Sequence, residues 1–380
     1  MASLVGTTMK RPKLLFFVTE DWVFCSHRLA LGRAAVNAGY EVVLVTRLRE
    51  HKKLIEDAGI RVIPIEHQRG GLNLFSDFRV LLHLWSAYQM EAPNLVHHVA
   101  LKPVLLGSLV AALAGIPQVN AITGLGWIFI SKSTTAKFLS IVLTGFLRLV
   151  LRRGISILQN PEDQNWIVNL GIPISSTRLI RGAGVDIEKF TPKFKGLTEP
   201  PTVVLVARML FDKGVLEFVD AAKQLRTKGV SGRFVLVGAP DQANRASVTL
   251  TQLERWQAEG VVEWWGYRDD IPTCYGQAHI ACLPSYREGL PKSLLEAAAC
   301  GLPIVTTDTP GCREVVRDEE NGLLVPVKNS NALADALERL LIDPALRDNM
   351  GKRSREIAEN EFDVEHVIAK TLEVYRELSA

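Results

Sequence analysis

The chain has 380 residues, of which 47% are hydrophobic and 22% charged, and its net charge is +3. This length predicts two domains of ordinary size, and the composition is typical of a well-packed globular protein. Residues 1–195 hold 23 Lys and Arg against 13 Asp and Glu, a net charge of +10, whereas residues 196–380 hold 21 against 28, a net charge of −7. The basic half predicts an anionic partner, such as phosphate or an anionic membrane surface. Nucleic acid is not expected, because no Lys/Arg run with interleaved aromatic residues and no zinc-ligand spacing is present.

The cysteines and the termini indicate a cytoplasmic protein. None of the five cysteines forms a CxxC pair, so free thiols in a reducing compartment are expected instead of a disulfide framework (Cys25, Cys274, Cys282, Cys300 and Cys312). The first 13 residues lack the apolar segment of a secretory signal, and no run of about 20 apolar residues predicts a membrane span. We expect the protein to lie peripherally on the inner face of the cell membrane.

One segment predicts the membrane contact. Lys137–Arg153 reads KFLSIVLTGFLRLVLRR, is interrupted by Arg148 and ends in two arginines. This pattern is typical of a basic amphipathic helix that lies in a membrane interface. The alternative is a core or interdomain helix with a solvated basic end.

In chain order, the first half alternates between strand-like and helix-like runs. Lys13–Thr19 is a buried apolar run, and Arg28–Tyr40 follows with helical spacing and Gly39 near its end. Further β-rich runs come at residues 41–47, 60–65 and 94–100. Such alternation predicts an α/β domain with a parallel sheet and helices on both faces.

The alternation restarts after Thr191–Thr202, a Pro-, Gly- and Lys-containing stretch that is typical of a linker. We therefore expect two Rossmann-like domains, residues 1–195 and 196–380, that face a central cleft. Strands are predicted in the second domain at residues 203–209, 233–238, 261–266, 279–285, 303–308 and 322–327. The last helix, about residues 361–380, is expected to close the chain and to pack back on the N-terminal domain.

The segment YREGLPKSLLEAAACGLPIVTTD, from Tyr286 to Asp308, carries the most informative spacing. It follows a predicted strand, where ligands of parallel sheets bind, and Pro291 is expected in the first turn of the next helix. The amides of Gly289, Leu290 and Lys292 would then face the ligand, and a helix N-terminus favours phosphate. If residues 288–296 were all helical, they would rise roughly 12 Å, too long for the ~5 Å carboxylate pair of a retaining glycosidase.

Glu288 and Glu296 therefore suit a ligand with a sugar at one end, a ribose at the other and a diphosphate between them, that is, a nucleotide-sugar. Arg208 lies at the end of a predicted strand and Lys213 begins the next helix. The two cations are expected to hold the diphosphate and to stabilise it as a leaving group. A pair of solvated surface charges is the alternative interpretation.

These motifs resemble the retaining family 4 glycosyltransferases of GT-B fold. REGLPKSLLEAAACGLPIV is the most specific part, and VARMLFDKG, QNPEDQNWIVNLGI, IRGAGVDIEKF, EWWGYRDDIP, TTDTPGCREVV and NGLLVP keep the usual family order over nearly the whole chain. The resemblance implies that Glu288 contacts the donor sugar and Glu296 the ribose. The amides of Gly289, Leu290 and Lys292 would take the diphosphate with Arg208 and Lys213, and Pro291 would lie in the same donor-binding loop. Gly266, Tyr267 and Arg268 would lie near the base.

In the first half, HHVALKPVLLGSLVAALAGIPQVNAITGLGW resembles transferases that extend sugars on polyprenyl-diphosphate carriers. The resemblance implies a UDP-hexose or UDP-N-acetylhexosamine donor and a lipid-linked saccharide acceptor. It also places five residues on the acceptor side (His27, Arg28, Lys102, Thr123 and Gly124). Two departures concern acceptor contacts and sugar identity: TEDWVFCSHR replaces a paired-glycine loop, and Thr123 stands where many members have histidine.

The expected reaction needs no cofactor and no protein nucleophile, because the departing UDP phosphate takes the proton of the attacking hydroxyl on the same face. No metal site is expected, since His97 and His98 are adjacent on a predicted strand and point to opposite faces. Alternatives are a UDP-N-acetylhexosamine epimerase of the same fold, transfer to a non-lipid acceptor, and a non-enzymatic membrane-binding module. A dinucleotide oxidoreductase is disfavoured because Gly-x-Gly-x-x-Gly is missing after the first strand.

Overall fold

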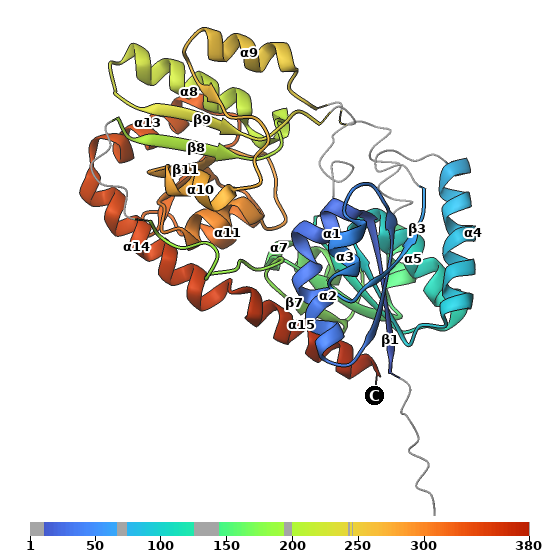
Figure 1. Ribbon diagram of the computed structural model, residues 1–380. Coiled ribbons are helices and arrows are strands. Elements are labelled where there is room, and N and C mark those ends of the chain that lie inside the picture. Colours follow the sequence, from blue (N-terminus) through green and yellow to red (C-terminus); the bar gives the residue numbers. More distant parts are fainter. Residues whose placement is uncertain are drawn as a thin grey trace, which may run out of the picture. The chain divides into compact units, whose positions relative to one another are not determined.

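The computed structural model describes residues 11–66, 74–124, 144–193, 200–241, 244 and 246–379. The chain divides into two compact units (Figure 1). Unit 1 comprises Met1–Ile180 with Ile368–Ala380, and unit 2 comprises Arg181–Val367. In the described part of the chain, no helix is both long and apolar enough to cross a bilayer.

Unit 1 is built on a seven-stranded parallel sheet in the order β3-β2-β1-β4-β5-β6-β7. Its strands are β1 (Lys13–Glu20), β2 (Glu41–Arg47), β3 (Arg61–Pro64), β4 (Leu95–Val99), β5 (Gln118–Ile122), β6 (Gly154–Leu158) and β7 (Thr177–Leu179). Its helices are α1 (Asp21–His27), α2 (Leu29–Asn37), α3 (Lys52–Glu56), α4 (Leu74–Glu91), α5 (Leu101–Ala114), residues 144–151 and α7 (Pro161–Asn169), and a short 3-10 turn, η2 (Ile174–Ser176), precedes β7. The helix predicted over Arg28–Tyr40 is shorter, and α1 occupies the stretch where the paired-glycine loop is replaced.

Unit 2 has a six-stranded parallel sheet in the order β10-β9-β8-β11-β12-β13. Its strands are β8 (Thr202–Val206), β9 (Arg233–Val237), β10 (Glu263–Trp264), β11 (Ile280–Leu283), β12 (Ile304–Thr307) and β13 (Gly322–Val325). Its helices are η3 (Phe211–Lys213), α8 (Val215–Thr227), α9 (Leu250–Ala258), α10 (Ile271–Gly276), α11 (Lys292–Ala299), α12 (Pro310–Val315), α13 (Ser330–Ile342), α14 (Pro344–Glu361) and the start of α15 (Val364–Ser379). The predicted α/β architecture with parallel sheets is confirmed.

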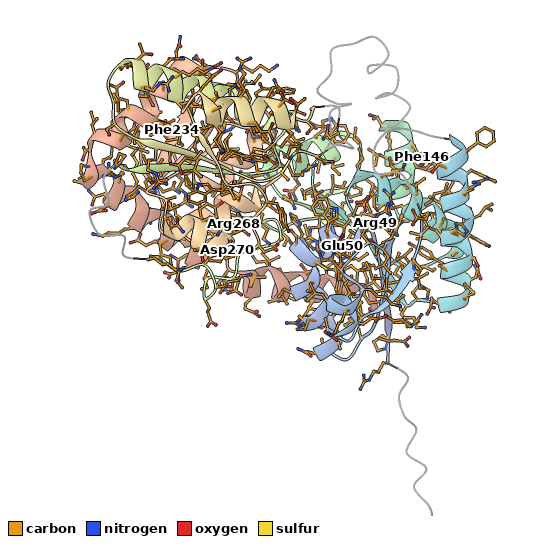
Figure 2. All side chains as sticks on the ribbon, turned by 45° about the horizontal axis from the view of Figure 1, so that its top comes forward. Arg49, Glu50, Phe146, Phe234, Arg268 and Asp270 are labelled. Atoms are coloured by element: carbon orange, nitrogen blue, oxygen red, sulfur yellow. The ribbon has the colours of Figure 1, made fainter. Side chains whose placement is uncertain are left out.

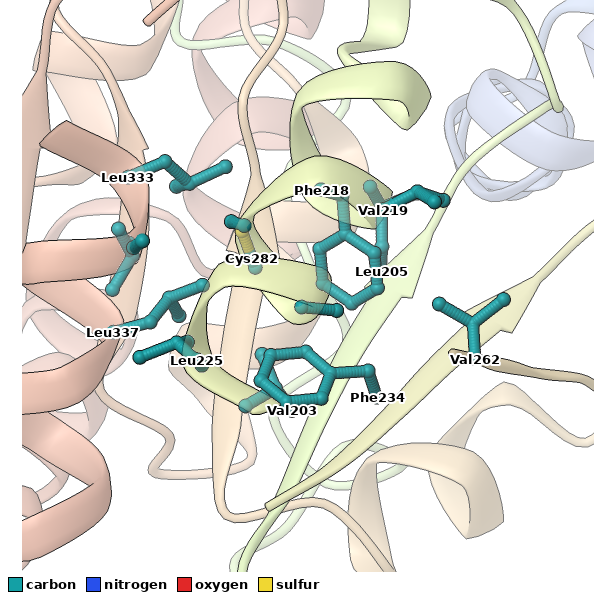
Figure 3. Packing of buried hydrophobic residues seen from close by; sticks show 14 of the residues in the cluster. Val203, Leu205, Phe218, Val219, Leu225, Phe234, Val262, Cys282, Leu333 and Leu337 are labelled. Atoms are coloured by element: carbon teal, nitrogen blue, oxygen red, sulfur yellow. The ribbon is translucent and has the colours of Figure 1, made fainter. Parts of the chain in front are cut away.

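Apolar residues fill both faces of the second sheet because successive strand residues point to opposite sides. Val203 and Leu205 of β8 pack with Phe218 of α8 and Leu337 of α13 (Figure 3). Val204, between them in the sequence, belongs to the core of the other face, which contains α11. The two helices that follow β8 and β11 thus lie on opposite faces of the sheet.

The end of unit 1 differs from the expected domain boundary. Unit 1 ends at Ile180, ahead of the boundary at 195, because Val185 already donates its N–H to the carbonyl oxygen of Phe362 at 2.8 Å. Phe190 belongs to the core of unit 2 as well. The C-terminal residues from Ile368 onward belong to unit 1, where Tyr375 is fully buried and Arg178 forms two hydrogen bonds with Glu377.

The described part of Lys137–Arg153 begins at residue 144, and residues 137–143 lie outside the described residues. Leu147, Val150 and Leu151 are buried in a core cluster with β6 and α7. This part of the segment therefore packs into unit 1 as a core helix, and Leu149 is its one exposed large apolar side chain.

Candidate functional site

The centre of the second sheet is the place where its strand order reverses. β8 is the first strand of the unit, and β9 and β11 are its two neighbours. Open α/β sheets bind ligands beyond the carboxyl ends of the strands at such a point. The segments that leave these ends carry Lys213 after β8 and Glu288 after β11.

The structure brings Lys213 and Glu288 into contact, with Lys213 Nζ donating to Glu288 Oε1. Both side chains are largely buried, at 21% and 12% exposure. The contact is built by the backbone, since Tyr286 N–H and the Ser285 hydroxyl donate to the carbonyl oxygen of Asp212 at 2.9 and 3.0 Å. Lys213 ends η3, two residues before α8 begins, so it lies just ahead of the helix it was expected to start.

Gly214 makes the close approach of these two segments possible. Its φ of 72° lies in the left-handed region, and a Cβ at this position would stand 2.1 Å from the carbonyl oxygen of Pro284. Only glycine meets both conditions without moving the backbone.

Arg208 also has a carboxylate partner. It pairs with Asp241, in the loop after β9, at an N–O distance of 2.5 Å. The two expected diphosphate cations thus each hold a carboxylate, Asp241 for Arg208 and Glu288 for Lys213. Asp241 could not be predicted from the sequence, because it stands 33 residues from Arg208 and comes near only through the pairing of β8 with β9.

Pro291 is the N-cap of α11, with φ of −75° and ψ of 112°, so the prediction that it opens the first turn was wrong. Residues 288–291 are therefore not helical, and the condition behind the 12 Å rise is not met. Gly301 lies just past the helix end with φ of 68°, as predicted. Pro291 does not open the helix because its backbone is extended, so it ends the loop and α11 begins at Lys292.

Glu296 lies one turn into α11 and is buried, and its carboxylate is 3.4 Å from Lys292 Nζ. Burial raises the pKa of Glu296, and the charge of Lys292 opposes this rise. Lys292 and Glu296 thus stand one helical turn apart at the end of α11 that faces the Glu288 loop.

The loop of Glu288, Gly289 and Leu290 is also fixed from its other sides. Gly311 N–H donates to the Glu288 carbonyl oxygen at 3.2 Å, and a Cβ on Gly311 would stand 2.4 Å from the Gly289 carbonyl oxygen. The Leu290 side chain packs over Gly182, where a Cβ would stand 2.7 Å away. Leu290 therefore holds the loop by packing, and Gly182 and Gly311, which lie inside the quoted motifs, are supports that the sequence analysis did not assign.

Gly266, Tyr267 and Arg268 follow β10. The Gly266 carbonyl oxygen accepts the N–H of Gly238 at 2.8 Å, which ties this loop to the one after β9. Tyr267 is 71% exposed. Arg268 forms two hydrogen bonds with Asp270, at 2.7 and 2.6 Å, and the two side chains lie together in Figure 2. These residues reach the same carboxyl edge as Arg208, with Arg268 engaged on a local carboxylate.

The residues expected on the acceptor side all belong to unit 1. Its strand order also reverses, between β1 and β4, where α1 and α5 begin. His27 is exposed at the end of α1. Arg28, the next residue, is buried, and burial lowers the pKa of its guanidinium. Lys102, in the first turn of α5, pairs with Asp77 at 2.6 Å. Thr123 and Gly124 follow β5 and are half-buried.

Two residues at this edge had no signal in the sequence analysis. Asp21 is fully buried and accepts the backbone N–H groups of Arg49 and His51 at 2.7 and 3.1 Å. Ala100, immediately before α5, has φ of 78°, which is unusual for a residue with a side chain. Buried carboxylates and strained backbone of this kind are frequent at functional sites.

His97 and His98 have partners on opposite faces of the first sheet. His97 Nδ1 lies 2.5 Å from the hydroxyl of Tyr375, and His98 contacts Tyr88 and Asn120 at 2.9 and 2.8 Å. Burial lowers the pKa of both imidazoles, that of His98 to about 4. Within the described ranges no group of three His, Cys, Asp or Glu residues is arranged to hold a metal ion.

This lowered pKa predicts a stability change at acid pH. The pKa of histidine in an unfolded chain is about 6.5. Between about pH 6.5 and 4, His98 is therefore protonated in the unfolded chain but neutral in the folded one, and the free energy of unfolding falls as the pH drops through this range. Between pH 7.5 and 5.0 we expect the wild-type chain to lose about 2 kcal/mol more than His98→Gln. Urea unfolding at both pH values measures this difference, and parallel losses in the two proteins would contradict it.

Two protein families match the chain. The family described as "Glycosyl transferase 4-like" matches residues 13–152, and "Glycosyl transferases group 1" matches residues 186–357. An N,N'-diacetylbacillosaminyl-diphospho-undecaprenol alpha-1,3-N-acetylgalactosaminyltransferase from Campylobacter jejuni is 30% identical over 92% of this chain and 94% of its own. A UDP-Gal:alpha-D-GlcNAc-diphosphoundecaprenol alpha-1,3-galactosyltransferase from Escherichia coli is 27% identical over 84% of each chain.

Two solved structures share the fold. HepE of Anabaena, in complex with UDP and glucose, has a TM-score of 0.77 at 19% identity and covers 96% of this chain and 99% of its own. A sucrose-phosphate synthase from Thermosynechococcus elongatus has a TM-score of 0.79 at 22% identity and covers 97% and 99%. At these identities the likeness extends to the fold, two Rossmann-like domains of GT-B type.

Proposed function

Because the chain belongs to the glycosyltransferases that join a glycosyl transferase 4-like domain to a group 1 domain, we propose that it moves a hexose or N-acetylhexosamine from a UDP-sugar to a saccharide carried on a polyprenyl diphosphate. The relatives from Campylobacter and Escherichia coli support the acceptor class, since both names contain an undecaprenol diphosphate. The Escherichia coli enzyme and the UDP complex of HepE support the donor class. The proposed role is surface polysaccharide or glycan assembly, on the cytoplasmic face of the membrane.

The contact between Lys213 and Glu288 carries this proposal. A lysine ammonium has three N–H donors, so Lys213 can keep Glu288 and still donate to a phosphate oxygen. In this arrangement Glu288 lies beside the bond between the sugar and the diphosphate, where its carboxylate accepts hydrogen bonds from the sugar hydroxyls. The amides of Gly289, Leu290 and Lys292 precede or begin α11, and their positive end favours the same phosphate.

The proposed mechanism retains the configuration of the transferred sugar. The bond between the sugar and UDP breaks, and Lys213, Arg208 and the helix end stabilise the charge that develops on the diphosphate. The acceptor hydroxyl attacks the oxocarbenium-like centre from the face that UDP leaves, and the departing phosphate takes its proton. Glu288 positions the sugar, Glu296 the ribose, and the loop of Gly266 and Tyr267 lies near the base. The reaction as proposed needs no metal.

A panel of UDP-sugars incubated with one short lipid-linked saccharide tests this function. We expect UDP release and a lengthened lipid-linked product with at least one donor, and neither without the acceptor. Conversion of a UDP-N-acetylhexosamine to its epimer without lipid would identify an epimerase instead. Equal transfer to a free saccharide would remove the lipid-linked acceptor from the proposal, and NMR of the product linkage decides retention.

A further inference from the structure

Helix α4 exposes a row of large apolar side chains. Phe75, Phe78, Leu82 and Trp85 are 88%, 60%, 55% and 41% exposed. Their spacing of three and four residues places them on one side of the helix, over roughly 15 Å. We call these four residues the α4 stripe. Monomeric proteins rarely expose a contiguous apolar surface of this kind unless something binds to it.

The stripe is additional to the core-facing side of the helix. Val80, Leu84 and Tyr88 are buried against the sheet of unit 1 with Leu15 and Val43. Helix α4 therefore has apolar residues on two opposite sides, and folding of unit 1 uses one of them. Figure 1 shows α4 beside α5 at an outer edge of unit 1.

The exposed formal charge of α4 itself is positive. Arg79 and His83 are exposed on the same part of the helix. The two carboxylates of α4 are engaged elsewhere, Asp77 with Lys102 at 2.6 Å and Glu91 with Lys13 at 2.9 Å. The exposed surface of α4 thus presents a guanidinium and no exposed carboxylate among its described side chains.

The neighbouring helices also expose apolar side chains. Shared core clusters connect α4 to α5 and α5 to the helix at residues 144–151. Leu113 of α5 and Leu149 are 69% and 67% exposed. The helix at residues 144–151 and the turn after it also carry three exposed arginines, Arg148, Arg152 and Arg153. Arg153 donates to the carbonyl oxygen of Ala112 at 3.0 Å.

We propose that this face of unit 1 docks on an anionic lipid bilayer, with the α4 stripe entering the membrane interface and Arg79, Arg148 and Arg152 meeting lipid headgroups. An apolar row beside cations is what an interfacial helix requires. The proposal rests on the proposed function, because a polyprenyl-linked acceptor has its lipid in the bilayer. It moves the main apolar contact to α4 from Lys137–Arg153, where Leu147, Val150 and Leu151 are buried.

A second copy of the chain is the other occupant to consider. Two α4 stripes packed antiparallel would bring the Arg79 side chains of both copies close together. No exposed carboxylate of α4 is available to pair with them, so the contact would include like-charge repulsion. An anionic lipid surface removes this repulsion and buries the same side chains.

Flotation of the full chain with vesicles that contain no lipid-linked saccharide tests the surface separately from catalysis. We expect binding to phosphatidylcholine vesicles with phosphatidylglycerol, and little binding to phosphatidylcholine alone. Phe78→Ser with Leu82→Ser should weaken partitioning at least about tenfold at an unchanged melting temperature, since both side chains are exposed. Arg79→Glu should reduce the preference for anionic vesicles. Ile342→Ser, at a 68% exposed apolar residue of unit 2, is the matched control.

Two results would overturn the docking surface: a wild-type chain that does not float with anionic vesicles, and a double variant that floats like the wild type. If such a variant also changes a dimer to a monomer in ultracentrifugation, the occupant of the α4 stripe is a second copy of the chain. Transfer to a detergent-solubilised acceptor is measured alongside. If that transfer persists while flotation fails, the surface is wrong and the transferase proposal stands.

Discussion

Replacement of Lys213 by methionine is expected to lower kcat/KM for sugar transfer by about 10³-fold. The substitution removes the ammonium proposed to stabilise the leaving diphosphate. It also leaves Glu288, whose side chain is 12% exposed, without the cation that it contacts. UDP affinity should fall as well, because the same ammonium binds the product. Calorimetric titration of UDP and initial rates of transfer measure the two effects.

Glu288→Gln separates the sugar contact from the phosphate contact. We expect transfer to fall by 10²-fold or more, while UDP binding stays near that of the wild type, since UDP carries no donor sugar. The double variant should be about as slow as Lys213→Met alone, because the two residues act on one transition state. Multiplied losses would show instead that Lys213 and Glu288 act independently.

Lys228→Met is the matched control for a paired lysine in unit 2. Lys228 contacts Asp335 and Glu338 at 3.0 and 2.7 Å, and it follows α8 at the end opposite to Lys213. An exposed ion pair contributes little to stability, so both rate and UDP affinity should stay unchanged. Wild-type turnover by Lys213→Met would remove the central cation from the mechanism.

The alternating apolar runs were enough to predict both parallel sheets, because buried strands and their covering helices have distinct spacings. Glu288 and Lys213 followed from the same pattern, since each comes directly after a central strand. The partner of Arg208 did not follow. Asp241 reaches it only because β9 lies beside β8, and strand order is not written in local spacing.

The exposed surface of unit 1 was beyond prediction for a related reason. Residues 74–91 have apolar side chains around most of the helix, so the sequence does not tell which side the sheet covers. The C-terminal helix illustrates the same limit. It was expected to pack back on the N-terminal domain, but its amphipathic pattern does not tell that Tyr375 contacts His97, 278 residues away.

Gly311→Ala is expected to reduce transfer by about 10²-fold or more with a small effect on folding, because the site depends on the position of the Glu288 loop. A Cβ at Gly311 would stand 2.4 Å from the carbonyl oxygen of Gly289 and 2.7 Å from that of Glu288. Both are backbone atoms, so the loop itself must move. Alanine favours the helical backbone of α12 by up to about 1 kcal/mol over glycine, which offsets part of the strain.

Gly145→Ala is the control that separates the clash from the change of residue type. Gly145 is also helical, and a Cβ there meets no atom within 4 Å. The melting temperature and turnover of Gly145→Ala should equal or exceed those of the wild type. For Gly311→Ala we expect a higher KM for the UDP-sugar together with the lower kcat, since the displaced loop carries both Glu288 and the amides before α11. Wild-type kinetics in this variant would mean that the loop position is not what sets the rate.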